Sequence, residues 1–111
     1  MDTYTPAYPK STYKKPHVKV QKIKMQEHRE CWHCHTTLTL EAHHCMGGAN
    51  RPLSERYGLK VYLCHEHHTG GTGVHFNKIL MDKLRREAQK RFEQIYSREE
   101  FIRLFGRNYN V

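Results

Sequence analysis

Cysteine and histidine, the residue types best suited to metal chemistry, crowd into residues 31–75 of this chain. This segment holds all four cysteines and most of the ten histidines. Zinc sites in proteins usually take four such ligands, often as two pairs with short internal spacers. Two pairs of this kind are present, Cys31 with Cys34 and Cys64 with His67. The spacing therefore predicts that these four side chains bind one structural Zn²⁺.

Two short strands are expected to position these residues. Residues 38–42 alternate between apolar and polar side chains, which is typical of a β-strand. His43 and His44 end this strand, and consecutive strand residues point to opposite faces. One histidine can therefore hold a metal while its neighbour faces a substrate. Residues 60–63 read as a second strand that delivers Cys64.

The rest of the chain after the first strand is expected to be irregular and then helical. Residues 46–58 and the glycine-rich residues 69–73 have the composition of loops. From Phe76 onward, apolar residues recur every three or four positions, which predicts an amphipathic helix. Its apolar residues are Phe76, Ile79, Leu80, Leu84, Ala88, Phe92, Ile95 and Tyr96. A capping motif at Ser97 predicts a second, short helix that Gly106 ends.

Residues 1–25 are expected to form an extended basic arm. Residues 1–16 carry three prolines, three tyrosines and three lysines, and proline disfavours a packed helix or a central strand. This part is either a solvated tail or an arm whose lysines follow phosphates while its tyrosines stack on bases. Residues 17–25 fit a short edge strand with a bulge, and their lysines suit either solvent or a phosphate backbone.

Length and charge narrow the class of protein. The 111 residues suit one small domain, whose thin core a structural metal would strengthen. The formal net charge of +8 favours a polyanionic partner, of which nucleic acid is the commonest. No apolar run is long enough to span a membrane, and the N-terminus lacks the features of a signal peptide. We therefore expect a cytoplasmic protein whose cysteines stay reduced and available to metal.

The ordered motifs of residues 31–78 resemble HNH nucleases of the ββα-metal (His-Me finger) superfamily that contain an embedded zinc knuckle. These motifs are Cys31-x-x-Cys34, Glu41-Ala42-His43-His44 and Leu63-Cys64-x-x-His67-His68. Residues 47–51, 57–64 and 73–77 look most similar to small HNH-like proteins of bacteriophages, including recombination nucleases of the Ref type. The resemblance does not extend to residues 1–25.

The resemblance implies a role for each matching residue. Cys31, Cys34, Cys64 and His67 match the structural Zn²⁺ ligands. His43, His68 and His75 match ligands of a catalytic divalent ion, and His44 matches the general base that activates the attacking water. The implied catalytic ion is Mg²⁺ or Mn²⁺, with Zn²⁺ or Ni²⁺ able to take its place in a crystal.

These residues also suit the chemistry itself. Phosphodiester hydrolysis needs a water in line with the leaving oxygen, a base for its proton and a cation at the phosphate. Imidazole, whose ordinary pKa is about 6.5, suits that proton transfer. Positive side chains can stabilise the developing charge. The candidates for nucleic-acid contact are Lys14, Lys15, Arg51, Arg56, Lys78 and Arg85.

The chain departs from the family pattern at one important position. Many members carry an asparagine shortly before the second zinc pair, where it orients the general base. Leu59 stands at that place in this chain, so a backbone carbonyl or Asn50 would have to orient His44. The glycine-rich segment before His75 also interrupts the usual helix. Cys45 occupies an apolar position and is expected to be a small buried hydrophobe.

We therefore expect an α+β fold with a zinc-stapled ββα-metal core at residues 26–78, preceded by the arm and followed by a helical extension over residues 76–111. The expected function is a metal-dependent HNH-type DNA endonuclease of phage origin, acting in recombination or DNA processing. The alternatives are a non-catalytic zinc-stabilised DNA-binding module and a phage protein that binds a partner. The expected partners are single- or double-stranded DNA, a second copy of the chain or a host recombination protein, in an infected or lysogenic bacterium.

Overall fold

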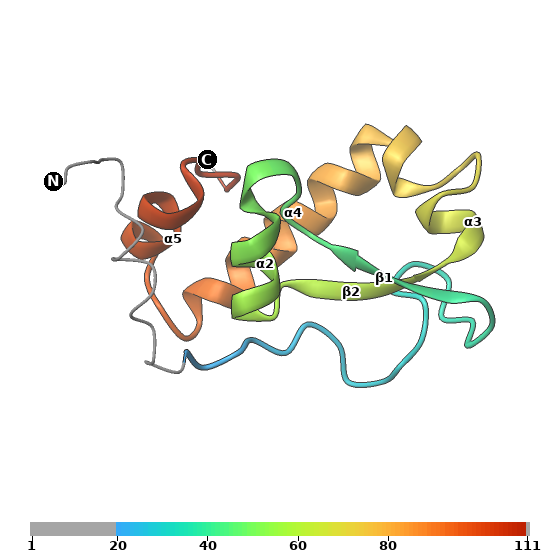
Figure 1. Cartoon of the computed structure of the whole chain (residues 1–111), viewed down its shortest axis with the longest axis horizontal. Helices are drawn as coiled ribbons and strands as arrows, with labels where there is room; N and C mark the ends of the chain where they lie inside the picture. The colour runs from blue at the N-terminus through green and yellow to red at the C-terminus, as the bar shows by residue number, and fades with distance from the viewer. Residues whose placement is uncertain (1–19, 111) are drawn as a thin grey trace, which may run out of the picture.

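A computed structural model describes residues 20–110, and the expectations for residues 1–19 lie outside this part. The elements in chain order are β1 (Leu40–His44), the 3₁₀ helix η1 (Gly48–Asn50), α2 (Arg51–Tyr57), β2 (Lys60–Cys64), α3 (His65–His68), the 3₁₀ helix η2 (Val74–Phe76), α4 (Lys78–Glu93) and α5 (Arg98–Phe105). The described chain is therefore a small α+β domain with a two-stranded sheet and helices around it (Figure 1).

The two predicted strands are confirmed, and they pair antiparallel. Leu40 lies opposite Cys64 and His44 lies opposite Lys60, so both strands bring metal-type residues to the ends of the sheet. The first strand begins at Leu40 because Thr39 has a left-handed backbone with φ of 51°, which a β-ladder does not accommodate. Figure 1 shows α4 running across one side of the strands, with α2 and α3 toward opposite ends of the sheet.

The expectation of a loop over residues 46–58 is wrong, because residues 51–57 form α2. Pro52 lies in the first turn of this helix, where a missing N–H group is tolerated. Gly58 ends the helix with a left-handed φ of 77°. A Cβ atom on Gly58 would lie 2.6 Å from the carbonyl oxygen of Ile23. The proline and glycine that suggested a loop are thus the start and the end of a helix.

The edge strand expected for residues 17–25 is absent from its described part, residues 20–25, which have no regular secondary structure. Ile23 and Met25 are nevertheless buried. The Ile23 N–H donates to the Tyr57 carbonyl oxygen at 2.8 Å, and the Gln26 side chain accepts the Tyr62 N–H at 2.8 Å. This segment therefore packs on the core along the sheet, rather than extending away from it (Figure 1).

The amphipathic helix is confirmed as α4, although its buried face is narrower than expected. Leu80, Leu84, Ala88 and Phe92 are buried. By contrast, 72% of Phe76 and 79% of Ile79 are exposed. Phe76 precedes α4, and Ile79 points away from the buried face of the helix.

The second predicted helix is confirmed as α5. The Ser97 side chain accepts the Glu100 N–H at 3.0 Å, and Gly106 ends the helix in a left-handed conformation. Aromatic rings join α2, α4 and α5, since the Phe92 ring lies 5.5 Å from that of Tyr57 and 5.3 Å from that of Phe101. This packing fixes α2 beside the sheet. Among residues 20–110, no helix has the length and apolar character needed to cross a membrane.

Candidate metal centres

Cys31, Cys34, Cys64 and His67 lie close together and can bind a metal ion as one set. One ligand atom from each residue lies within 4.8 Å of the others. The two sulfur atoms of Cys34 and Cys64 are 3.8 Å apart, and Nδ1 of His67 is 3.2 Å from Cys64 Sγ. The two pairs predicted from their spacing therefore converge. They do so because β2 ends at Cys64 and α3 begins immediately after it.

The backbone around Cys31 favours the thiolate form that binds metals. Burial raises the pKa of the Cys31 thiol, but nearby backbone N–H groups outweigh this effect and bring the pKa down to about 6. The Cys34 N–H, 3.4 Å from Cys31 Sγ, is one of these donors. The Trp32 N–H donates to the Tyr62 carbonyl at 2.8 Å, which ties this knuckle to β2.

A second cluster contains His43, His68 and His75. Their ligand nitrogens also lie within 4.8 Å of one another. The centroid of the His43 ring is 5.2 Å from that of His68 and 5.4 Å from that of His75. The structure therefore brings together the three histidines expected from β1, from the residue after the second zinc pair and from the start of the helical segment.

His43 has an unusual environment for a histidine. Only 6% of it is exposed, and within the described residues its Nε2 has no hydrogen-bond partner. Burial, together with the neighbouring His68 and His75, lowers the pKa of His43 to about 4. The ring is therefore neutral, and a neutral imidazole has one nitrogen lone pair that can bind a metal ion. A buried nitrogen without a partner is destabilising, whereas a metal ion bound by the three imidazoles would satisfy it.

Glu41 is a functional candidate that the sequence analysis did not single out. Its carboxylate contacts Nδ1 of His68 at 2.8 Å and Nδ1 of His65 at 2.9 Å. A carboxylate only accepts hydrogen bonds, so the contact places a proton on His68 Nδ1 and leaves Nε2 free to bind a metal. Histidine ligands commonly have such a carboxylate partner. The available signal was that Glu41 lies two residues before His43, on the same face of the strand.

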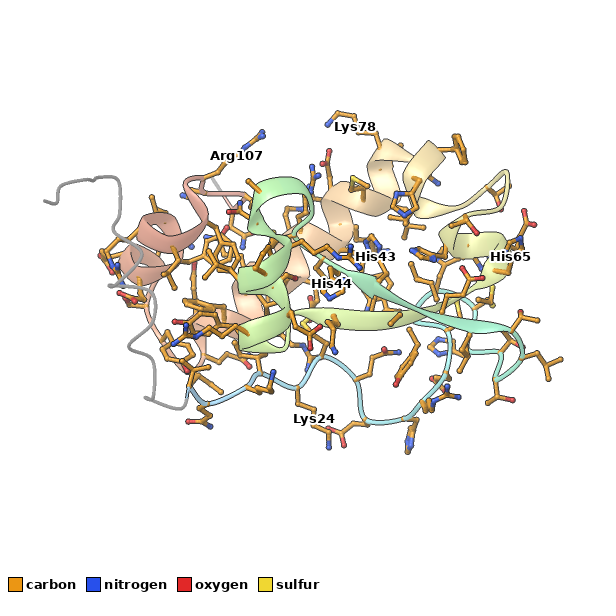
Figure 2. All side chains as sticks on the ribbon, in the orientation of Figure 1. Lys24, His43, His44, His65, Lys78 and Arg107 are labelled. Carbon is orange, nitrogen blue, oxygen red and sulfur yellow. The ribbon has the colours of Figure 1, made fainter. Side chains whose placement is uncertain are left out.

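His44 contacts two polar side chains of α2, those of Glu55 and Arg51. Its Nε2 lies 2.8 Å from Glu55 Oε1, and Nε of Arg51 lies 3.3 Å from its Nδ1. Figure 2 shows His43 and His44 near the middle of the molecule, beside α2. Asn50 was one of two groups suggested to orient His44, the other being a backbone carbonyl, but its side chain instead donates to the Phe105 carbonyl at 3.1 Å. Glu55 could not be recognised as the partner while residues 46–58 were interpreted as a loop.

All four histidines of the predicted active site line one pocket of about 600 Å³. Among the predicted nucleic-acid contacts, Arg51 and Arg85 line this pocket as well, whereas Arg56 and Lys78 do not. Lys78 pairs with Asp82 at 2.8 Å and lies at the periphery in Figure 2. Lys14 and Lys15 fall outside the described residues.

Cys45 also lines this pocket, but it is almost fully buried. Burial raises the pKa of its thiol to about 12. It therefore stays protonated and acts as a small apolar residue, as expected.

Neither a protein family model, a curated protein nor a solved structure matches the chain. Its function must therefore be inferred from the residues of the two clusters and from the pocket that the second cluster lines.

Proposed function

We propose that this protein is a metal-dependent endonuclease that hydrolyses phosphodiester bonds in DNA. The observation that carries this proposal is the buried Nε2 of His43, which has no hydrogen-bond partner among residues 20–110, together with the clustering of His43 with His68 and His75. A fourth histidine, His44, lines the same pocket and is free of that cluster. Phosphodiester hydrolysis needs a cation at the phosphate and a base for the proton of the attacking water, and three clustered imidazoles and a separate fourth imidazole can supply these two functions.

The donor atoms indicate which ions fit the two clusters. Three thiolates and one imidazole are a typical ligand set for structural Zn²⁺, so we assign this ion to Cys31, Cys34, Cys64 and His67. The second cluster offers only imidazole nitrogens. Imidazole suits first-row transition metals better than Mg²⁺, which prefers oxygen ligands. We therefore expect Mn²⁺, Ni²⁺ or Zn²⁺ to bind more tightly than Mg²⁺ at His43, His68 and His75.

Each polar residue of the pocket has a distinct task in this proposal. The bound divalent ion would supply Lewis-acid charge neutralisation at the scissile phosphate. His44 takes a proton from the attacking water as its oxygen bonds to phosphorus. The bond from phosphorus to the leaving sugar oxygen breaks, and this oxygen takes up a proton from solvent water. Arg51 and Arg85, which line the pocket, bind the remaining phosphate oxygens.

The arrangement of elements is consistent with the HNH, or ββα-metal, superfamily as the origin of this site. The second of two antiparallel strands is followed by α3, which carries His67 and His68, and His75 precedes α4. The net charge of +8 supports DNA as the substrate. A phage origin, a role in recombination or DNA processing, and a cytoplasmic site of action with a host protein or a second copy as partner belong to the same proposal.

One observation favours a second candidate function, binding without catalysis. Phe76 at the end of η2 and Ile79 in the first turn of α4 expose large apolar side chains close in sequence to His75. A contiguous patch of exposed apolar side chains often marks a surface for a partner, and these two exposed residues are three positions apart in the sequence. A non-catalytic module of this fold would use that surface together with its basic residues and would leave DNA intact.

The two candidates differ in one assay, cleavage of supercoiled plasmid DNA with Mn²⁺, Mg²⁺ or a chelator. We expect nicking with Mn²⁺, weaker nicking with Mg²⁺ and none with the chelator. His44→Ala should abolish nicking, whereas His28→Ala should retain it, because His28 is exposed and lies outside both clusters. DNA binding without nicking by the intact, zinc-loaded chain would overturn the nuclease proposal and favour the binding module.

A further inference from the structure

We propose that Arg51 and Glu55 of α2 together determine where His44 carries its proton, with Glu55 holding it on Nε2 and Arg51 covering Nδ1 until a phosphate enters. Glu55 is then a positioning residue for the general base, and Arg51 makes the base available only in the presence of substrate. This inference rests on the proposed function only where it says that His44 acts as a general base and that substrate releases it. The proton position and its control by Glu55 are properties of the free protein.

The geometry follows from the spacing on the helix. Arg51 and Glu55 are four residues apart in α2, so their side chains lie on the same face of the helix. That face meets His44 at the end of β1, with Arg51 Nε at 3.3 Å from Nδ1 and Glu55 Oε1 at 2.8 Å from Nε2. Both nitrogens of the ring are therefore contacted by one helix.

The two contacts agree on a single tautomer of the neutral ring. A carboxylate can only accept a hydrogen bond, so Nε2 must carry the proton and donate its N–H group to Glu55. A guanidinium group can only donate, so Nδ1 must present its lone pair to Arg51. The reverse tautomer would set a lone pair against the carboxylate and a proton against the guanidinium. The pocket therefore favours the form whose Nδ1 can take a proton from water.

Glu55 is suited to remain an ionised acceptor. The hydrogen bond with His44, followed by that with Lys60, lowers the pKa of the Glu55 carboxyl. Lys60 Nζ lies 3.1 Å from Oε1 and 3.2 Å from Oε2 of Glu55. About half of the Glu55 side chain is exposed, so the chain does not need this residue to fill its core. Its carboxylate contacts His44 and Lys60, so its role in the structure is polar rather than packing.

A substrate phosphate that entered the same pocket would offer Arg51 a second partner. A guanidinium group binds a phosphate through two parallel hydrogen bonds, which is stronger than one long contact to a neutral nitrogen. When a phosphodiester enters, Arg51 is expected to turn from Nδ1 to the phosphate oxygens. Nδ1 then accepts a proton from the attacking water while the water oxygen bonds to phosphorus. The base would thus be uncovered by the substrate itself.

The proton position can be measured by NMR of the full, metal-loaded chain, using the side-chain ¹H and ¹⁵N signals of His44. We expect a proton on Nε2 that exchanges slowly with solvent because it is hydrogen-bonded to the Glu55 carboxylate. Glu55→Ala should remove this signal, Glu55→Gln should partly retain it through the amide oxygen, and Lys60→Met should keep it. A slowly exchanging proton on Nδ1, or an unchanged signal in Glu55→Ala, would overturn the role of Glu55 whether or not the protein cuts DNA.

The role of Arg51 is tested in the same sample with inorganic phosphate as the probe. Phosphate should shift the Nδ1 resonance of His44 in the intact chain, because Arg51 leaves this atom. In Arg51→Met the resonance should start near the shifted position and respond little to phosphate. An Nδ1 resonance that is the same in both proteins, with and without phosphate, would show that Arg51 does not cover the base.

Cleavage kinetics separate positioning from a purely structural role. Glu55→Ala should lower kcat roughly 10- to 100-fold, the usual effect of losing a group that orients an active-site side chain, with KM nearly unchanged. Glu87→Ala removes a comparable helix ion pair, that of Glu87 with Arg91 at 2.9 Å, and should alter neither constant. Equal kcat for Glu55→Ala and the intact chain would contradict the positioning role while leaving the nuclease proposal in place.

Discussion

His67 and His68 are consecutive residues of α3, yet they belong to two different clusters. Nδ1 of His67 lies 3.2 Å from Cys64 Sγ, whereas the ring of His68 lies 4.9 Å from that of His75. Because α3 contains only four residues, neither histidine can move without the other. The two clusters are therefore mechanically joined through one short helix.

This connection predicts that losing a ligand from the cysteine cluster weakens the histidine cluster. Cys64→Ser should lower the affinity of the histidine cluster for Mn²⁺ by about tenfold or more, within the usual range of coupling between sites. Leu84→Ala is the matched control, since it destabilises the buried core without removing a ligand. Calorimetric Mn²⁺ titration of the folded proteins provides the measurement. Equal losses in the two variants would mean that α3 does not couple the clusters.

Glu41 should support His68 as a metal ligand without binding the metal itself. Glu41→Gln is expected to weaken Mn²⁺ binding at the histidine cluster roughly 10- to 100-fold, while the zinc content of the protein stays the same. Glu66→Gln is the matched control. The Glu66 carboxylate accepts a hydrogen bond from the Thr72 hydroxyl at 2.8 Å. Among the described residues, it makes no hydrogen bond to a ligand of either cluster. If both variants bind Mn²⁺ like the intact chain, the contact between Glu41 and His68 has no role in metal binding.

Placing an asparagine at position 59, as in the HNH nucleases that the sequence motifs resemble, should not improve activity. Leu59 is fully buried, and its carbonyl accepts the Ser54 hydroxyl at 2.6 Å. Leu59→Asn places an amide among apolar side chains and should lower the free energy of unfolding by about 2–4 kcal/mol. Urea unfolding of the metal-loaded protein measures this change, with Leu59→Met as a control expected to lose less than about 1.5 kcal/mol. A faster and equally stable Leu59→Asn variant would refute the prediction.

Two glycines with the same backbone conformation should respond differently to alanine. Gly58 and Gly106 have φ of 77° and 81°, so each alanine incurs a left-handed penalty of about 1–2 kcal/mol. At Gly58 the new Cβ would also lie 2.6 Å from the Ile23 carbonyl oxygen, whereas at Gly106 nothing lies within 4 Å. Gly58→Ala should therefore lose a further 1–3 kcal/mol, an approximate range for overpacking. Equal urea midpoints for the two variants would show that residues 20–26 do not pack as described.

The metal-type motifs and the C-terminal helices could be predicted because their signals are local. The pairs at Cys31 and Cys64 depend on short spacers, α4 on its helical period and α5 on the Ser97 cap. The faces of β1 follow from simple alternation, which separates His43 from His44. Such patterns need no knowledge of what lies opposite them in the fold.

The partners of the predicted residues could not be found in this way, because they depend on tertiary contacts. Pro52 and Gly58 suit a loop and the ends of a helix equally well, and α2 was missed for this reason. Without α2, neither Arg51 nor Glu55 could be placed beside His44. Ile23 and Met25, which were placed in the predicted edge strand, are buried, but they pack on the core rather than pair in a sheet.

The most direct test of the nuclease proposal is Mn²⁺-dependent nicking of supercoiled plasmid by His43→Ala, with the zinc content measured on the same sample. We expect the variant to keep one equivalent of zinc on the cysteine cluster, to bind Mn²⁺ much more weakly and to lose nicking. This result would tie cleavage to the buried His43 rather than to a contaminating nuclease or to the structural ion. Nicking at the rate of the intact chain, with zinc retained, would contradict the central claim that His43, His68 and His75 hold the catalytic ion.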